Sequence, residues 1–142
     1  MDFKNYDPEQ VTVSFMDIDI RGYMDGTFIE VERDEEAFTK HVGALGDVTR
    51  TRNLNRSGKV TITLTQAAPS NDLLSSSHLD DEQFGLNYGP LKIQDHNGNM
   101  RVFATYAWIS KAPKIERAKE SGSVQWVFDC ADLKIEAGGN VL

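Results

Sequence analysis

Apolar and polar side chains alternate with a period of two along much of this chain, and this period is typical of half-buried β-strands. The alternation is clearest at 60–65, where Val60, Ile62 and Leu64 are separated by threonines. Similar patterns occupy 11–15, 27–33, 102–110 and 124–130. β-branched residues are frequent in these stretches and suit a pleated sheet. The sequence therefore predicts a mainly β fold.

Two of these stretches predict where the core lies. Along 124–130, the heavy apolar side chains of Trp126, Phe128 and Cys130 share one face. Along 102–110, the same alternation places on one side Val102, Ala104, Tyr106 and Trp108. We therefore expect the core to include Trp108, Trp126, Phe128 and Cys130.

Turn residues separate the strand patterns, and one segment fits a helix better. Asp25-Gly26, Ser57-Gly58 and the loop 95–99 are typical turn sequences, and Gly138-Gly139 ends the last pattern. A cap at Ser70 or Asn71, with Asp72 in the first turn, favours a helix start. Three leucines then supply an apolar stripe: Leu73, Leu74 and Leu79. The sequence predicts a helix at about 70–82.

The segment 41–58 fits neither pattern. Its first part is rich in glycine, and the stretch 47–53 is polar on both faces. A strand that is polar on both faces has little to bury and a weakly specified register. Long loops inside a compact domain are usually functional or disordered. We expect 41–58 to be a long extended loop, an arm that becomes ordered only against another subunit.

Length and charge exclude several classes of protein. The 142 residues suffice for a single domain spanning 1–142. The net charge of −7 argues against binding nucleic acid by neutralising phosphates. A lone cysteine, Cys130, excludes an internal disulfide framework. No apolar run approaches the roughly 18 residues of a membrane span, and the start lacks the apolar stretch of a signal peptide. We expect a cytosolic chain with no membrane partner.

The charge is unevenly distributed along the chain. Residues 1–36 carry 11 acidic and 3 basic side chains, whereas 37–66 carry five bases and one acid. Residues 67–142 carry 10 acids and 7 bases. The basic block could fold onto the acidic part of its own molecule. Alternatively, identical subunits could meet head to tail, since charge complementarity fixes partner and register.

Catalytic and ligand-binding patterns are missing from the sequence. It contains no Gly-x-Ser-x-Gly elbow, no phosphate-binding glycine loop and no dinucleotide fingerprint. His41, His78 and His96 are scattered without a second ligand at metal-binding spacing. Cys130 lies on an apolar face and is predicted to be a packed thiol. The basic stretch 40–59 contains no aromatic residue on which a base could stack. We predict no enzyme, no cofactor and no metal.

Several stretches, in order and spacing, together resemble one family. They are Tyr6-Asp7-Pro8, 10–15, 25–33, 37–43, 55–64, 69–72, Gly89-Pro90-Leu91, Ala107-Trp108-Ile109, 118–120 and 126–133. This ordered set resembles the tail tube proteins of contractile-tailed bacteriophages. Type VI secretion tubes and R-type pyocin tubes are similar in architecture.

The resemblance implies a β-sandwich or barrel-like domain with one packed α-helix. It also implies hexameric rings that stack into a hollow tube inside a contractile sheath, through which genomic DNA passes at infection without specific binding. The implied partners are other copies of the chain and the tail sheath, tape-measure, baseplate and tail terminator proteins. The implied location is the tail of the virion, assembled in the host cytoplasm. The family has no enzymatic activity and no cofactor.

Two sets of residues become hypotheses under this resemblance. An acidic or neutral lumen would let DNA slide, and the candidate lumen-facing side chains are Glu30, Glu32, Thr61, Thr63 and Thr65. An outer solvated face is the alternative for the same residues. The arm would join adjacent rings through Arg50, Arg52 and Arg56, which would meet Glu32, Glu35 and Glu36. Two other functions stay open: a monomeric β-domain that binds a small ligand or protein, and the tube of a DNA-free injection device.

Overall fold

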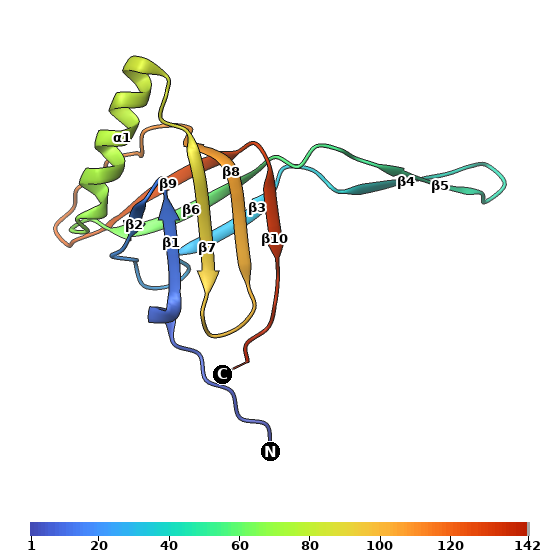
Figure 1. Ribbon diagram of the computed structural model, residues 1–142, viewed down its shortest axis with the longest axis horizontal. Coiled ribbons are helices and arrows are strands. Elements are labelled where there is room, and N and C mark those ends of the chain that lie inside the picture. Colours follow the sequence, from blue (N-terminus) through green and yellow to red (C-terminus); the bar gives the residue numbers. More distant parts are fainter. Residues whose placement is uncertain (142) are drawn as a thin grey trace.

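Eight strands form one antiparallel sheet that curls into a sandwich-like body (Figure 1). The computed structural model describes residues 1–141. The strand order is β2-β1-β7-β8-β9-β6-β3, and β10 also pairs with β8. The strands are β1 (Val11–Phe15), β2 (Ile18–Ile20), β3 (Ile29–Arg33), β6 (Gly58–Thr65), β7 (Gly89–Asp95), β8 (Arg101–Ile109), β9 (Ser123–Cys130) and β10 (Leu133–Glu136). A short 3-10 helix, η1 (Pro8–Gln10), precedes β1.

The core lies between the two layers that the curled sheet forms. Alternate residues of β1, β6, β7 and β9 point inward and are buried. The rings of Phe15 on β1 and Phe128 on β9 meet edge to face, with centroids 4.9 Å apart. Trp126 and Cys130 are buried beside them. The strand alternation seen in the sequence is therefore what builds this interior.

Strand β8 changes its inward face partway along. Leu91 of β7 pairs with Ala104, but Gly89 pairs with Ala107, so β8 contains one extra residue. This bulge shifts the alternation, and Ala107 and Ile109 become the buried side chains. Tyr106 is exposed, and Trp108 is only half-buried on the outer face. The prediction that Trp108 belongs to the core is therefore wrong, because the alternation does not run unbroken through the bulge.

Helix α1 (Ser70–Phe84) packs against one side of the body (Figure 1). It ends at Gly85, whose positive φ of 68° permits the left-handed cap. The last helical residue, Phe84, lies two residues beyond the predicted end at 82. The buried side chains are Ser70, Leu74 and His78, while Leu73 and Leu79 are exposed. No helix within residues 1–141 is long and apolar enough to cross a membrane.

Two side chains at the start of α1 join the helix to the body. Asn71 donates to the backbone oxygen of Thr65 at 3.0 Å and accepts from the indole nitrogen of Trp126 at 3.0 Å. Ser70 accepts from the backbone nitrogen of Arg21 at 2.9 Å. The mainly β fold with a packed helix is confirmed in the part of the chain that the structure describes.

A second, two-stranded sheet extends away from the body (Figure 1). Its strands, β4 (Phe38–Val42) and β5 (Val48–Arg52), form a hairpin that leaves the end of β3 and returns to β6. The Gly43 nitrogen donates to the Asp47 oxygen at 2.7 Å and closes the turn. The hairpin occupies 38–52, so it overlaps the predicted loop 41–58 and begins three residues before it.

Candidate functional site

The hairpin has two chemically different faces. Residues that pair directly across an antiparallel ladder share a face, and successive residues alternate between faces. One face, called the cationic face below, consists of Phe38, Lys40, Val42, Val48, Arg50 and Arg52. The other, the threonine face, consists of Thr39, His41, Thr49 and Thr51. The sequence alone suggests that both faces of 47–53 are polar. The strand register shows that the cations and exposed apolar residues share one face, while the threonines and His41 share the other.

The cationic face combines charge with exposed apolar area. The guanidinium carbon of Arg50 lies 4.2 Å from the ring centroid of Phe38. Toward the tip, Val48 is 64% exposed and Leu45 is 94% exposed. Every residue of β4 and β5 is exposed. An isolated two-stranded hairpin is marginally stable in water, so this face is suited to packing against another surface.

The acidic residues that are predicted to meet the arginines of another subunit's hairpin lie where the hairpin leaves β3. We call this part of the chain the root of the hairpin. Glu35 accepts a hydrogen bond from the Asn53 side chain at 2.7 Å. Hydrogen bonds from Asn53, and then Asn55, hold the pKa of Glu35 below its usual value. Glu32 lies on β3 and Glu36 on the segment that leads into β4.

Within residues 1–141, the basic block 37–66 forms no ion pair with the acidic segment 1–36. The ion pairs within residues 1–141 are His78–Glu82, Lys114–Glu116 and Lys134–Glu136. Arg50, Arg52 and Arg56 are absent from this set. The uneven charge had two explanations: the basic block folds onto the acidic part of its own molecule, or identical subunits meet head to tail. No ion pair supports the first explanation.

The five candidate lumen residues share one outer face of the body, called the polar sheet face below. Across β3 and β6, Glu30 pairs with Thr61 and Glu32 with Lys59. Thr63 and Thr65 continue this row and pair with Gln125 and Ser123 of β9. The structure therefore brings these residues together, and it adds Lys59 and Asp129, which the sequence did not single out.

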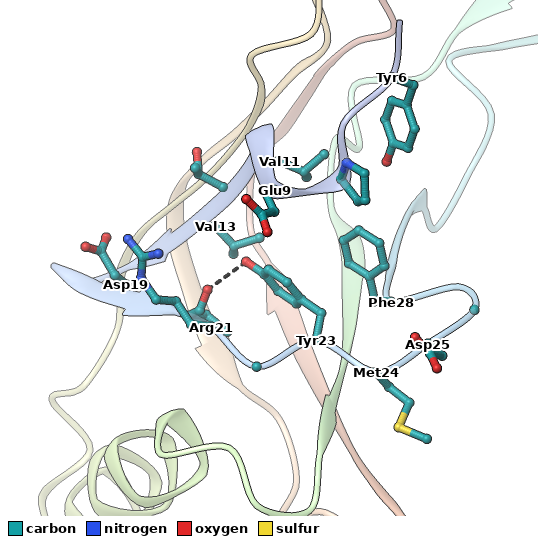
Figure 2. Close-up of a pocket in the computed structure, with 15 residues that line it drawn as sticks. Tyr6, Glu9, Val11, Val13, Asp19, Arg21, Tyr23, Met24, Asp25 and Phe28 are labelled. Carbon is teal, nitrogen blue, oxygen red and sulfur yellow. Dashed lines mark hydrogen bonds between the residues drawn. The ribbon is translucent and has the colours of Figure 1, made fainter.

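A groove of about 1000 Å³ (Figure 2) lies beside β1 and β2, on the side of the body away from the hairpin (Figure 1). It is bounded by η1, β1, β2 and the segment that leads to β3. Its apolar lining comes from Val11, Val13, Ile20, Tyr23 and Phe28, and its charged lining from Glu9, Asp19, Asp25 and Arg21. This set is called the acidic groove below. All of its lining residues lie between Tyr6 and Phe28. The sequence gives little sign of the groove, because these residues come together only when β1 and β2 fold back on each other.

The side chain of Tyr23 is held in place within the acidic groove by a hydrogen bond and an aromatic contact. Its hydroxyl donates to the Ile20 oxygen at 2.7 Å, and its ring lies 4.9 Å from that of Phe28. Burial raises the pKa of Tyr23 to about 12, although the nearby Arg21 opposes the shift. The phenol is therefore neutral at physiological pH, and the groove's charge comes from its carboxylates and Arg21.

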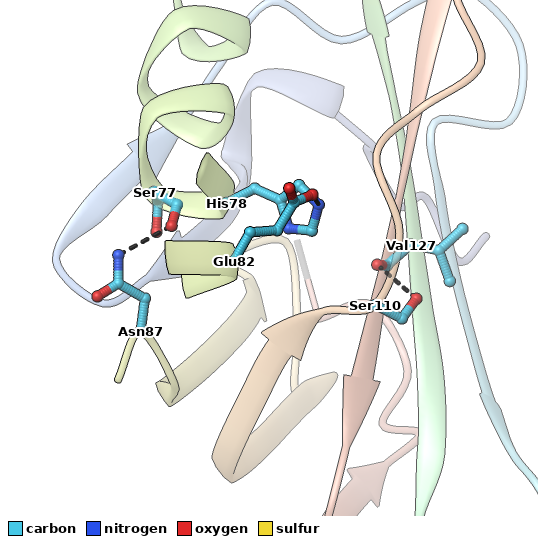
Figure 3. Close-up of polar contacts among 6 residues, drawn as sticks. All are labelled: Ser77, His78, Glu82, Asn87, Ser110 and Val127. Carbon is cyan, nitrogen blue, oxygen red and sulfur yellow. Dashed lines mark hydrogen bonds and ion pairs between the residues drawn. The ribbon is translucent and has the colours of Figure 1, made fainter. Parts of the chain in front are cut away.

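The residue types of a hydrolase are present but not arranged as a triad: Figure 3 shows His78 and Glu82 on α1 and Ser110 apart from them, beside Val127. The imidazole Nε2 of the buried His78 lies 2.8 Å from the Glu82 carboxylate, while Nδ1 has no hydrogen-bond partner. The Ser110 hydroxyl donates to the Val127 oxygen instead of to a histidine. Within residues 1–141, no serine–histidine hydrogen bond of the kind that activates a nucleophile is formed there.

Two other candidates for chemistry are a reactive cysteine and a metal site. Cys130 is buried, and burial, reinforced by Asp129, raises the pKa of its thiol to about 12. It therefore lacks the thiolate character of a reactive cysteine. No group of three or more His, Cys, Asp or Glu side chains among residues 1–141 could hold a metal ion.

The comparison with protein families and curated sequences gives two matches. Residues 11–138 match the family model described as bacteriophage PhiTE tail tube protein. Structural protein ORF10 of Pseudomonas phage KPP10 is 29% identical over 143 residues, covering 95% of this chain and 83% of the relative.

Solved structures with a similar fold belong to contractile injection systems. The anti-feeding prophage cap, which terminates the AFP tube, has a TM-score of 0.63 at 10% identity, covering 96% of this chain and 93% of the cap. A chain of the PVC sheath–tube complex in the extended state has a TM-score of 0.59 at 11% identity, covering 94% and 92%. A chain from the structure of the PVC sheath/tube terminator has a TM-score of 0.58 at 12% identity, covering 95% and 99%. At these identities the similarity shows the fold.

Proposed function

Because the chain belongs to the bacteriophage PhiTE tail tube protein family, we propose that it is the repeating subunit of a hollow phage tail tube. In this proposal hexameric rings stack inside a contractile sheath, and the tube conducts DNA into the host at infection. The subunit is structural and not catalytic. It assembles in the host cytoplasm and resides in the virion tail.

The observation that carries this proposal is the unsupported hairpin. Its strands are exposed along their whole length, and none of the ion pairs within residues 1–141 involves its cationic face. A contact between unlike surfaces of identical subunits is heterologous, and such contacts close into rings or extend into filaments. A hairpin on one side of every subunit is well placed to make one.

The hairpin joins adjacent rings through charge. Arg50, Arg52 and Arg56 face the acidic segment of a subunit in the next ring, which contributes Glu32, Glu35 and Glu36. A single exposed ion pair contributes only about 0–1 kcal/mol. The contact gains strength because it is repeated around each ring.

Reversing the hairpin charge tests this role. The double variant Arg50→Glu and Arg52→Glu should stay folded by circular dichroism but form no tubes in electron micrographs at high protein concentration. The matched control, Lys111→Glu with Lys119→Glu, changes two exposed cations outside the hairpin and should form tubes. Tubes of normal length from the hairpin variant would contradict the proposed contact.

The polar sheet face lines the lumen in this proposal. Glu30 and Glu32 would repel DNA, and Thr61, Thr63 and Thr65 would offer a neutral surface, so the polymer slides without adhering. Replacing Glu30 and Glu32 with lysine should permit assembly but slow DNA ejection, measured by release from tailed particles. Unchanged ejection through assembled tubes would place these residues on another surface.

The tube's other partners follow from its position in a tail. We propose that it contacts the sheath on the outside, the tape-measure protein within, and baseplate and terminator proteins at its two ends. Support comes from the similar folds of chains in a sheath–tube complex and in tube-terminating proteins. A DNA-free injection device would use the same subunit design.

The acidic groove favours one alternative, a monomeric β-domain that binds a small ligand or protein, because a concave apolar site with a few polar groups suits such binding. Electron microscopy of the purified protein separates the two functions. Rings or tubes support the tail tube, whereas a monomer at every concentration supports the binding domain.

A further inference from the structure

The tip of the hairpin is apolar, whereas its shaft is cationic. Val42, Leu45 and Val48 are all more than half exposed at or beside the turn. Lys40 and Arg50 pair directly on the shaft behind them. Asp47, in the turn, is the sole acid of the segment 38–52. A complementary surface would therefore need an apolar floor, several carboxylates and one cation.

The acidic groove has this composition. Its floor is apolar, and its charged lining contains the carboxylates of Glu9, Asp19 and Asp25 with the single guanidinium of Arg21. In Figure 2 Glu9 lies near the middle, while Asp19 and Asp25 lie toward opposite ends. The carboxylates can flank Lys40 on the shaft, and the guanidinium of Arg21 can donate hydrogen bonds to the Asp47 carboxylate in the turn. Charge complementarity of this kind fixes the register of a contact.

We infer that the acidic groove receives the hairpin tip of a second copy of this chain, which rests on the proposed function and specifies its inter-subunit contact. The tip cannot enter the groove of its own subunit. Phe28, at the start of β3, lines the groove, whereas the hairpin leaves from the other end of β3 and extends away from the body (Figure 1). The hairpin tip and the acidic groove therefore lie at opposite ends of each subunit, as a head-to-tail contact requires.

The lengths of the two elements agree with this placement. Strands β3, β4 and β5 each contain five residues, which corresponds to roughly 17 Å at about 3.4 Å per residue. Among residues 1–141, β3 pairs only with β6, so its other edge is free. A hairpin lying along this edge can reach from the acidic root near Glu32 to the groove beside Phe28. One acceptor subunit then holds both the root arginines and the apolar tip.

Disulfide trapping tests the inference on assembled protein. Leu45→Cys on one copy and Asp25→Cys on another should form a disulfide-linked dimer when mixed, assembled into tubes and mildly oxidised. Cys130 is buried in every copy and provides a constant background. The matched control combines Leu45→Cys with Leu73→Cys, an exposed residue of α1 outside the groove, and should give no such dimer.

The outcomes separate this inference from the function on which it rests. The Leu45–Asp25 link at several times the level of the control supports the inference. Tubes that assemble without that link overturn the groove as acceptor and leave the tail tube function standing. If the unmodified protein forms no rings or tubes, the proposed function fails and the inference fails with it.

Discussion

The hairpin and strands β6 and β9 are built from the same period of two, yet one is wholly exposed and the others form the core. In β6 and β9 one face is uniformly apolar, and the chain itself covers that face. In the hairpin, apolar residues share a face with Lys40, Arg50 and Arg52, which the chain leaves uncovered. Strand pairing gives both regions two alternating faces, and the composition of each face indicates whether the same molecule or another one covers it.

The two regions also differ in charge. The segment 1–36, which supplies most of the acidic groove, has 11 acidic and 3 basic side chains. The hairpin, at 38–52, instead carries three cations, Lys40, Arg50 and Arg52, and one acid, Asp47. A subunit divided in this way offers one end that fits the other end of its neighbour, which a uniformly charged surface would not do.

The largest expected difference between the regions is in stability. Trp126→Ala should lower the free energy of unfolding by about 3–5 kcal/mol, because it empties a buried site and removes a hydrogen bond to Asn71. Val48→Ala on the hairpin should change it by less than about 0.5 kcal/mol. Urea denaturation of the free subunit measures both. Equal losses would mean that the hairpin is part of the subunit's cooperative structure.

A smaller effect is expected where the helix is tied to the sheet. Asn71→Ala removes the bonds to Thr65 and Trp126 and should cost about 1–3 kcal/mol, because a buried indole N–H is left unpaired. Thr49→Ala, at an exposed hairpin position, is the control and should be nearly neutral. If the Asn71 variant is as stable as the control, the tie does not hold α1 on the body.

The effect that is smallest at neutral pH is a loss of stability at alkaline pH, which only the body should show. Burial raises the pKa values of Cys130 and Tyr23 to about 12, from ordinary values of 9.0 and 10.0. The folded state therefore favours their neutral forms, and this stability is complete below pH 9 and lost as the pH rises toward 12. Tyr23→Phe should flatten the decline measured by urea denaturation. Tyr106→Phe, at an exposed tyrosine, should not flatten it.

The sequence predicts the body better than the surfaces that join copies. Clean alternation locates β6 and β9 because each pattern runs unbroken from end to end. The same rule misplaces Trp108, since one extra residue in β8 reverses the inward face and no local signal marks it. Strand β10 was not predicted, because its residues Leu133–Glu136 are few and only Leu133 is buried.

The assembly surfaces depend on information that the linear sequence does not contain. The hairpin's cationic face emerges only when Lys40 is placed opposite Arg50 by the strand register. The acidic groove emerges only when η1, β2 and the segment before β3 are brought together. What the sequence does show is the uneven charge: the acidic segment 1–36 supplies the groove, and the basic segment 37–66 supplies the hairpin.

Amide hydrogen exchange over residues 38–52, compared between the free subunit and the assembled tube, tests the central claim most directly. An exposed hairpin with no covering partner should exchange rapidly in the free subunit, while β6 and β9 exchange slowly. Assembly should protect the hairpin by at least tenfold and leave β6 and β9 nearly unchanged. Rapid exchange of the hairpin in intact tubes, or slow exchange in the free subunit, would contradict the account.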